Sequence, residues 1–122
     1  MDTTKAALLL AAPALLALAG CRSGYDVDVR NLTDQPISAR LNVPFGDGAP
    51  RTLVERYVGP GERQNMFIQT DWGVHVSLAA DFQGNVGYPA VMDLSRGQTI
   101  VNVRRADDGT RGKLRLEEVP RP

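Results

Sequence analysis

Clusters of glycine, proline, aspartate and asparagine interrupt this chain at short intervals from residue 20 to its end. The 122 residues include 12 glycines and 8 prolines, and such residues tend to end helices and strands. The segments between clusters recur at about 8 to 12 residues, the spacing of short strands joined by turns. The sequence therefore predicts an all-β fold, an antiparallel β-sandwich that is immunoglobulin-like or related, with about seven to eight strands.

The segments between these clusters alternate apolar and polar residues, which is the pattern of a strand with one buried face. Tyr25, Val27 and Val29 form the first series, and the segment 37–43 repeats it. The turn sequence NLTDQP between them predicts that these two segments form a hairpin. Further strands are expected at residues 52–58, 63–69, 73–81, 88–94, 98–104 and 113–119.

Two of the expected strands have predictable places in a sheet. The alternation is strongest from residue 74 to residue 80, which indicates a central strand. In the last segment, Lys113, Arg115 and Glu117 alternate with leucines. Charges of this kind protect an edge strand from pairing with other chains, so this segment is expected at a sheet edge.

The N-terminal segment differs from the rest of the chain. Residues 6–19 contain only alanine, leucine and proline. As a helix this run would be about 21 Å long, shorter than the roughly 30 Å of the hydrocarbon core of a bilayer. The short length and the small residues Ala19 and Gly20 are typical of a secretory signal peptide, and we expect a signal helix within residues 1–20.

Leu18, Ala19, Gly20 and Cys21 resemble the lipobox of bacterial lipoproteins. This resemblance implies cleavage between Gly20 and Cys21 and attachment of a diacylglycerol to the Cys21 sulfur, with the new amino group usually acylated as well. Two or more acyl chains hold a protein durably at a membrane. Cys21 is the only cysteine, so its lipidation would leave no thiol for a disulfide.

The residues that follow the cysteine suggest a location and a distance. In lipoproteins of Gram-negative bacteria, aspartate after the cysteine tends to retain the protein at the inner membrane, but Arg22 stands there. The resemblance therefore implies the outer membrane, facing the periplasm. Residues 21–24 form the lipidated cysteine and a short tether, which would keep the β-sandwich domain of residues 25–122 within about 15 Å of its anchor.

No motif in the domain predicts catalysis, and we expect neither enzyme activity nor a cofactor. His75, the only histidine, is expected to be a half-exposed strand residue. Ser77 would lie about 6.7 Å away on the same strand, beyond the roughly 2.6 to 3.2 Å that a serine and its base need. Asp26 and Asp28 are expected to be solvated on the outward face of the first strand.

Metal binding and glycosylation are also weakly supported, and we predict no metal site. Asp107 and Asp108 could offer oxygen ligands to calcium, but Asp-Asp-Gly is also an ordinary hairpin turn. One histidine without a free thiol cannot supply a typical zinc ligand set. Asn31, Leu32 and Thr33 match a glycosylation acceptor, which we interpret as a turn.

The charge balance and the aromatic residues in expected loops indicate which kinds of partner to expect. The 14 basic side chains are balanced by 14 acidic ones, which argues against a nucleic-acid partner. Phe45, Trp72 and Tyr88 fall in expected loops, where aromatic groups can anchor a protein partner or instead cap the core. An open edge strand could also pair with the sheet of a partner.

The expected function is therefore that of a non-catalytic lipoprotein, a structural or protein-interaction component of the cell envelope. Its contacts would be the membrane, through the lipid on Cys21, and an envelope protein. Two alternatives stay open at this point: a lipoprotein that binds a small ligand or calcium, and a hydrolase.

Overall fold

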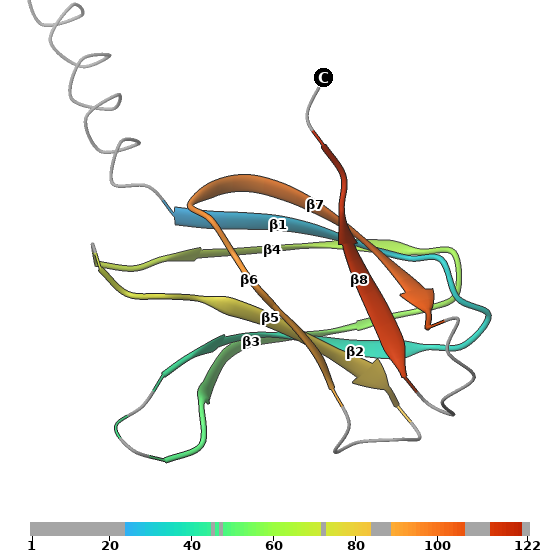
Figure 1. Cartoon of the computed structure of the whole chain (residues 1–122). Helices are drawn as coiled ribbons and strands as arrows, with labels where there is room; N and C mark the ends of the chain where they lie inside the picture. The colour runs from blue at the N-terminus through green and yellow to red at the C-terminus, as the bar shows by residue number, and fades with distance from the viewer. Residues whose placement is uncertain are drawn as a thin grey trace, which may run out of the picture.

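The computed structural model describes residues 24–44, 46, 48–71, 73–83, 89–106 and 113–120. The strands are β1 (Gly24–Asn31), β2 (Ile37–Val43), β3 (Arg51–Val58), β4 (Arg63–Gln69), β5 (Ser77–Phe82), β6 (Ala90–Asp93), β7 (Gly97–Arg105) and β8 (Leu114–Glu118). They form two four-stranded sheets, sheet A in the order β4-β1-β7-β8 and sheet B in the order β3-β2-β5-β6. Figure 1 shows the two layers. The predicted all-β fold is confirmed; the expected signal helix lies outside the described residues.

The core lies between the two sheets and follows the predicted alternation. Every second residue of β1 is buried, and Val29 of sheet A and Leu41 of sheet B are completely inaccessible to water. Each side chain of this kind contributes about 1.5 to 3 kcal/mol through its burial. One cluster contains the buried apolar residues of both sheets, so the two sheets pack face to face as in a β-sandwich.

The predicted hairpin of the first two segments is wrong. β1 pairs antiparallel with β4 and parallel with β7, whereas β2 pairs with β3 and β5. The segment 32–36 therefore crosses from sheet A to sheet B. Alternation specifies which face of a strand is buried, but it is satisfied equally well by strands on opposite sides of one core.

The strand expected at residues 73–81 begins only at Ser77. Gly73 has a φ of 91°, a left-handed conformation that favours glycine, and the Val74 N–H donates to the carbonyl of Asp71 at 3.3 Å. These residues make a turn before the strand. The predicted central strand and the predicted edge strand are both confirmed. β5 lies between β2 and β6, and β8 lies at the edge of sheet A.

The register of sheet A defines two ends of the molecule. Gly24 is level with Gln69 at one end, which we call the proximal end because β1 begins there. Arg30 is level with Arg63 near the other end, which we call the distal end. Along β1 the two ends are roughly 23 Å apart, so a group at the distal end is remote from Gly24, where the described part of the chain begins.

Candidate functional site

The predicted lipidation and cleavage residues, Gly20 and Cys21, lie outside the described part of the chain. The same is true of Phe45, Trp72 and Tyr88, the predicted partner contacts. The possible calcium ligands Asp107 and Asp108 also fall outside it. The described residues do, however, place the remaining candidates.

Asp26 and Asp28 point to the outer face of sheet A, as predicted. Asp26 accepts a hydrogen bond of 2.6 Å from Nδ2 of Asn65 on β4. A carboxylate oxygen of Asp28 lies 3.7 Å from Nε of Arg30, two residues along the same strand. Each carboxylate thus has a polar neighbour on an open sheet surface.

His75 is exposed and lies in the segment before β5, so its expected place on a strand was wrong. Because 73–76 forms the end of a turn, strand geometry does not relate His75 to Ser77.

Arginines gather on the outer face of sheet A at its distal end. Arg30 of β1 is the register partner of Arg63 of β4, and Arg104 of β7 is the register partner of Arg115 of β8. Like charges directly opposite each other in a sheet destabilise it. Glu117 offsets part of this repulsion. One of its oxygens accepts from Arg104 Nε at 3.2 Å, and the other lies 2.7 Å from a terminal nitrogen of Arg115.

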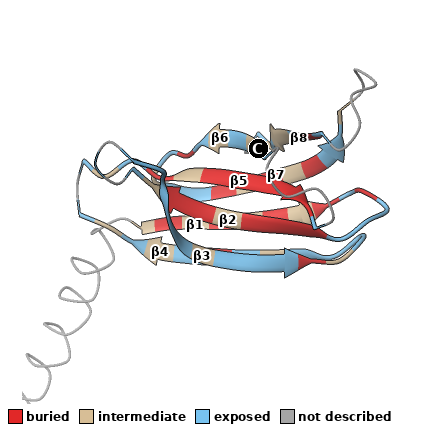
Figure 2. Ribbon diagram, turned by 90° about the horizontal axis from the view of Figure 1, so that it is seen from below, coloured by how far each residue is buried: buried red, intermediate tan, exposed pale blue. Residues whose placement is uncertain are grey.

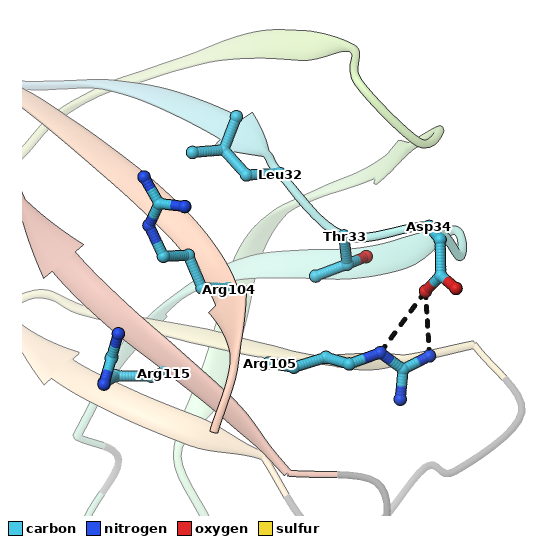
Figure 3. Close-up of a pocket in the computed structure, with 6 residues that line it drawn as sticks. All are labelled: Leu32, Thr33, Asp34, Arg104, Arg105 and Arg115. Atoms are coloured by element: carbon cyan, nitrogen blue, oxygen red, sulfur yellow. Dashed lines mark hydrogen bonds and ion pairs between the residues drawn. The ribbon is translucent and has the colours of Figure 1, made fainter. Parts of the chain in front are cut away.

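An open pocket of about 560 Å³ occupies this distal end. Among described residues its lining consists of Leu32, Thr33, Asp34, Arg104, Arg105 and Arg115. Figure 3 shows the arginines projecting from β7 and β8 while the β1–β2 loop forms the opposite wall. The described lining of the pocket therefore contains three guanidinium groups and one carboxylate.

Arg105 is held in place from two sides. Its terminal nitrogen donates to Oδ1 of Asp34 at 2.8 Å, and its Nε donates to the same oxygen at 3.3 Å (Figure 3). Its guanidinium carbon lies 5.0 Å from the centre of the Phe82 ring, within cation–π range. The hydrogen bond from Arg105, a backbone hydrogen bond and the positive charge of Arg105 all lower the pKa of Asp34 below its ordinary value.

The side chain of Asn31 holds the loop that contains Thr33 and Asp34 through hydrogen bonds. Its side chain is buried, and its amide nitrogen lies 2.8 Å from the carbonyl oxygen of Gln35 and 3.0 Å from that of Val58. Its Oδ1 accepts from the backbone N–H of Thr33 at 3.0 Å and from the Thr33 hydroxyl at 2.7 Å. Asn31 therefore joins two distal loops, and its amide is inaccessible to a glycosylating enzyme.

The outer face of sheet B has a different character. Figure 2 shows largely buried β2 and β5 between exposed β3 and β6. Ser38 and Ala79 point outward on the central strands and yet are almost fully buried. Beside them Arg40 donates to both carboxylate oxygens of Asp81, at 3.3 and 3.2 Å. The Asp81 side chain is 0% exposed and that of Arg40 is 17% exposed.

A second pocket, of about 490 Å³, lies over this ion pair. It is lined by Ser38, Arg40, Glu55, Tyr57 and Gln83. Tyr57 is 63% exposed, and its hydrogen bond with Glu55, together with the negative charge of Glu55, raises the pKa of Tyr57. An aromatic side chain this exposed suits contact with a partner, although the charges beneath it already satisfy each other.

In the described ranges, no group of three or more His, Cys, Asp or Glu side chains is arranged to hold a metal ion. No helix long and apolar enough to cross a membrane occurs among the same residues.

The sequence did not point to the arginine pocket. Its members come from three separate segments, and only the register of β7 with β8 places Arg104 opposite Arg115. The one available signal was Arg104-Arg105, the only adjacent pair of basic residues in the sequence. The sequence also did not reveal that the Asn31 side chain is buried, because Asn31, Leu32 and Thr33 were interpreted only as a turn.

Comparison with known proteins adds no family to these observations: no known family, no characterised protein and no solved structure matches the chain. The site must therefore be interpreted from its own chemistry.

Proposed function

We propose that this chain is a bacterial envelope lipoprotein, anchored through Cys21, which acts by binding a partner rather than by catalysis. The observation that carries the proposal is the lipobox pattern that ends at Cys21, followed after two residues by β1, which begins at Gly24. β1 is an interior strand of sheet A. A lipid on Cys21 would thus hold the core of the domain close to a bilayer. We propose the periplasmic side of the outer membrane as its location.

Phe67 supports a membrane-facing proximal end. Its side chain is 54% exposed, and it is level with Asp26 near the start of β1. A Cβ built on Gly24 would lie 2.8 Å from two atoms of its ring, so the ring covers the point where the tether enters the sheet. An exposed aromatic ring at that point suits the boundary between lipid headgroups and water.

The surroundings of the candidate catalytic residues and the exposed apolar side chains support binding through a surface. Asp26 is engaged by Asn65, and His75 is exposed in a turn. Exposed large apolar side chains instead stand on the strands of sheet B, including Leu53, Tyr57 and Val91. Side chains of this kind contribute to protein interfaces.

We further propose that the fold is a variant of the immunoglobulin-like sandwich. In that fold the second and fifth strands (B and E) are neighbours in one sheet, and the third and sixth (C and F) are neighbours in the other. The β1–β4 and β2–β5 pairs reproduce this arrangement. The departure is β7, which runs parallel to β1.

The test compares the native chain with Cys21→Ala in a bacterial host. The native chain should fractionate with membranes, and affinity capture from solubilised membranes should retain an envelope protein. Cys21→Ala should keep its signal segment and carry no lipid. Normal cleavage of the variant would contradict the proposal. Cys21 is outside the described domain, so circular dichroism of both chains should show the same β structure.

A further inference from the structure

We propose that the pocket on the outer face of sheet B binds a neutral saccharide, with the ring of Tyr57 against one face of the sugar. The described lining of this pocket belongs to the folded domain, so the inference does not rest on the lipid anchor. It goes beyond the proposed function because it assigns a ligand class to one site.

The residues that line this pocket point to the same side of the sheet. Tyr57 is the register partner of Ser38, and Glu55 is the register partner of Arg40. Directly opposed residues of paired strands share a face, and the residues on either side of Ser38 belong to the core. The shared face is therefore the outer one. Gln83, which follows β5, completes the described lining.

The charges at the pocket favour a neutral ligand. Arg40 donates to both carboxylate oxygens of Asp81, so these two charges compensate each other within the fold. An anion would compete with Asp81 for Arg40 and would be repelled by the carboxylate of Glu55, whereas a cation would be repelled by Arg40. A neutral polar ligand avoids both kinds of repulsion.

The polar groups of the lining call for a ligand that both donates and accepts hydrogen bonds. A guanidinium group has five N–H donors, and two of those in Arg40 donate to Asp81. The carboxylate of Glu55 only accepts, whereas the side chains of Ser38 and Gln83 can donate and accept. Because a hydroxyl group does both, a ligand with several hydroxyls matches this mixed lining.

Tyr57 adds an apolar surface beside these polar groups. It is 63% exposed, and its hydroxyl donates a hydrogen bond to the carboxylate of Glu55, which restrains the ring before a ligand binds. The face of an aromatic ring is apolar and carries partial negative charge, so it attracts C–H groups. A sugar ring has C–H groups on its faces and hydroxyls around its edge. It can therefore contact Tyr57 and the polar lining at the same time.

The size of the pocket suits a small sugar. Its volume is about 490 Å³, within the roughly 300 to 1,000 Å³ that is typical of small-molecule sites. The sugar could come from a free saccharide or from one unit of a glycan chain, because both present the same ring and hydroxyl groups. A soluble disaccharide and an insoluble glycan distinguish these two sources.

The experiment is an NMR titration of the full chain in micelles of a nonionic detergent whose headgroup contains no sugar. The probes are cellobiose, maltose and N,N′-diacetylchitobiose, and sedimentation with purified peptidoglycan is measured in parallel. We expect saturable shifts of the Tyr57 ring signals and upfield shifts of sugar C–H protons, because an aromatic ring shields protons that lie over its face. Raising the salt concentration should leave the affinity unchanged, since the ligand is neutral.

Substitutions at Tyr57 test the role of the ring. Tyr57→Leu keeps an apolar side chain without the aromatic face and should weaken binding about fivefold or more. Its Tm should stay near that of the native chain, because Tyr57 is largely exposed. Tyr57→Phe keeps the face and loses the hydrogen bond to Glu55, so it should weaken binding only about threefold.

Phe67→Leu is the matched control. Phe67 is also an exposed aromatic residue, at 54%, but it lies on sheet A and outside the described lining of the pocket. This variant should bind like the native chain. A response to a disaccharide indicates a free saccharide, and sedimentation with peptidoglycan without such a response indicates a glycan chain.

Three results would overturn the proposal. The first is that no disaccharide gives saturable shifts and peptidoglycan does not retain the chain. The second is that Phe67→Leu weakens binding as much as Tyr57→Leu does. The third is that added salt abolishes binding, which would assign the interaction to charge.

Discussion

On the outer face of sheet B, Arg40 and Asp81 form a one-to-one ion pair largely shielded from water. On the outer face of sheet A, Arg104 stands opposite Arg115 and Arg30 stands opposite Arg63. The first arrangement satisfies its charges within the fold. The second places like charges opposite each other at an open surface, where Glu117 lies between Arg104 and Arg115. The contrast teaches that arginines are paired one-to-one with a carboxylate on one sheet and share a carboxylate on the other.

The largest effect is expected from breaking the shielded pair. Asp81→Ala removes the carboxylate and leaves the Arg40 guanidinium without this partner in a place where water reaches it poorly. Loss of one partner of a buried pair costs about 3 to 5 kcal/mol, and chemical denaturation would measure it. The double variant Arg40→Met, Asp81→Leu should recover most of the loss. If Asp81→Ala is as stable as the native chain, the two faces do not differ in this way.

A smaller loss is expected at the loop that supports the pocket. Asn31→Ala removes the buried amide that serves carbonyl groups of two loops, and unpaired buried polar groups cost about 1 to 3 kcal/mol each. We expect the free energy of unfolding to fall by about 3 kcal/mol. Thr52→Ala is a useful control, because it removes a hydrogen bond to Asn42 near the proximal end and should cost only about 1 kcal/mol.

On sheet A a charge reversal should stabilise the protein. Arg63→Glu would place a carboxylate opposite Arg30, outside the described lining of the pocket at the distal end. Replacing a like-charge pair by an opposite-charge pair is expected to raise the free energy of unfolding by about 0.5 kcal/mol at low salt, with less effect at high salt. The free energy of unfolding of Arg63→Gln should lie between those of the native chain and Arg63→Glu. A destabilised Arg63→Glu variant would mean that these arginines support the sheet.

The smallest effect concerns pH at the rim of the pocket. The folded-state pKa of Asp34 is lowered, so its pairing with Arg105 adds stability above the unfolded-state pKa and loses it as pH falls through the folded-state value. Asp34→Asn should therefore be slightly less stable than the native chain at neutral pH. The difference should vanish below the ordinary aspartate range. A difference that persists in acid would assign the effect to something other than the charge.

The buried faces of the strands could be predicted from the sequence, whereas the pairing of the strands could not. Alternation located the strands, and in β1 it identified Tyr25, Val27 and Val29 as core residues. It could not choose the neighbours of β1, because the sheet crossing at residues 32–36 leaves the burial pattern of both strands unchanged. The register between the strands could not be predicted from the sequence either. Without the register, neither the Arg104–Arg115 opposition nor the diagonal contact of Arg40 with Asp81 could be predicted.

The proposed anchor is tested most directly by separating cells into membrane and aqueous fractions and analysing the N-terminus of the mature protein by mass spectrometry. The account predicts a first residue at Cys21 that carries a diacylglycerol and, on its amino group, a further acyl chain. A mature protein with a free thiol at Cys21, recovered entirely from the aqueous fraction, would contradict it.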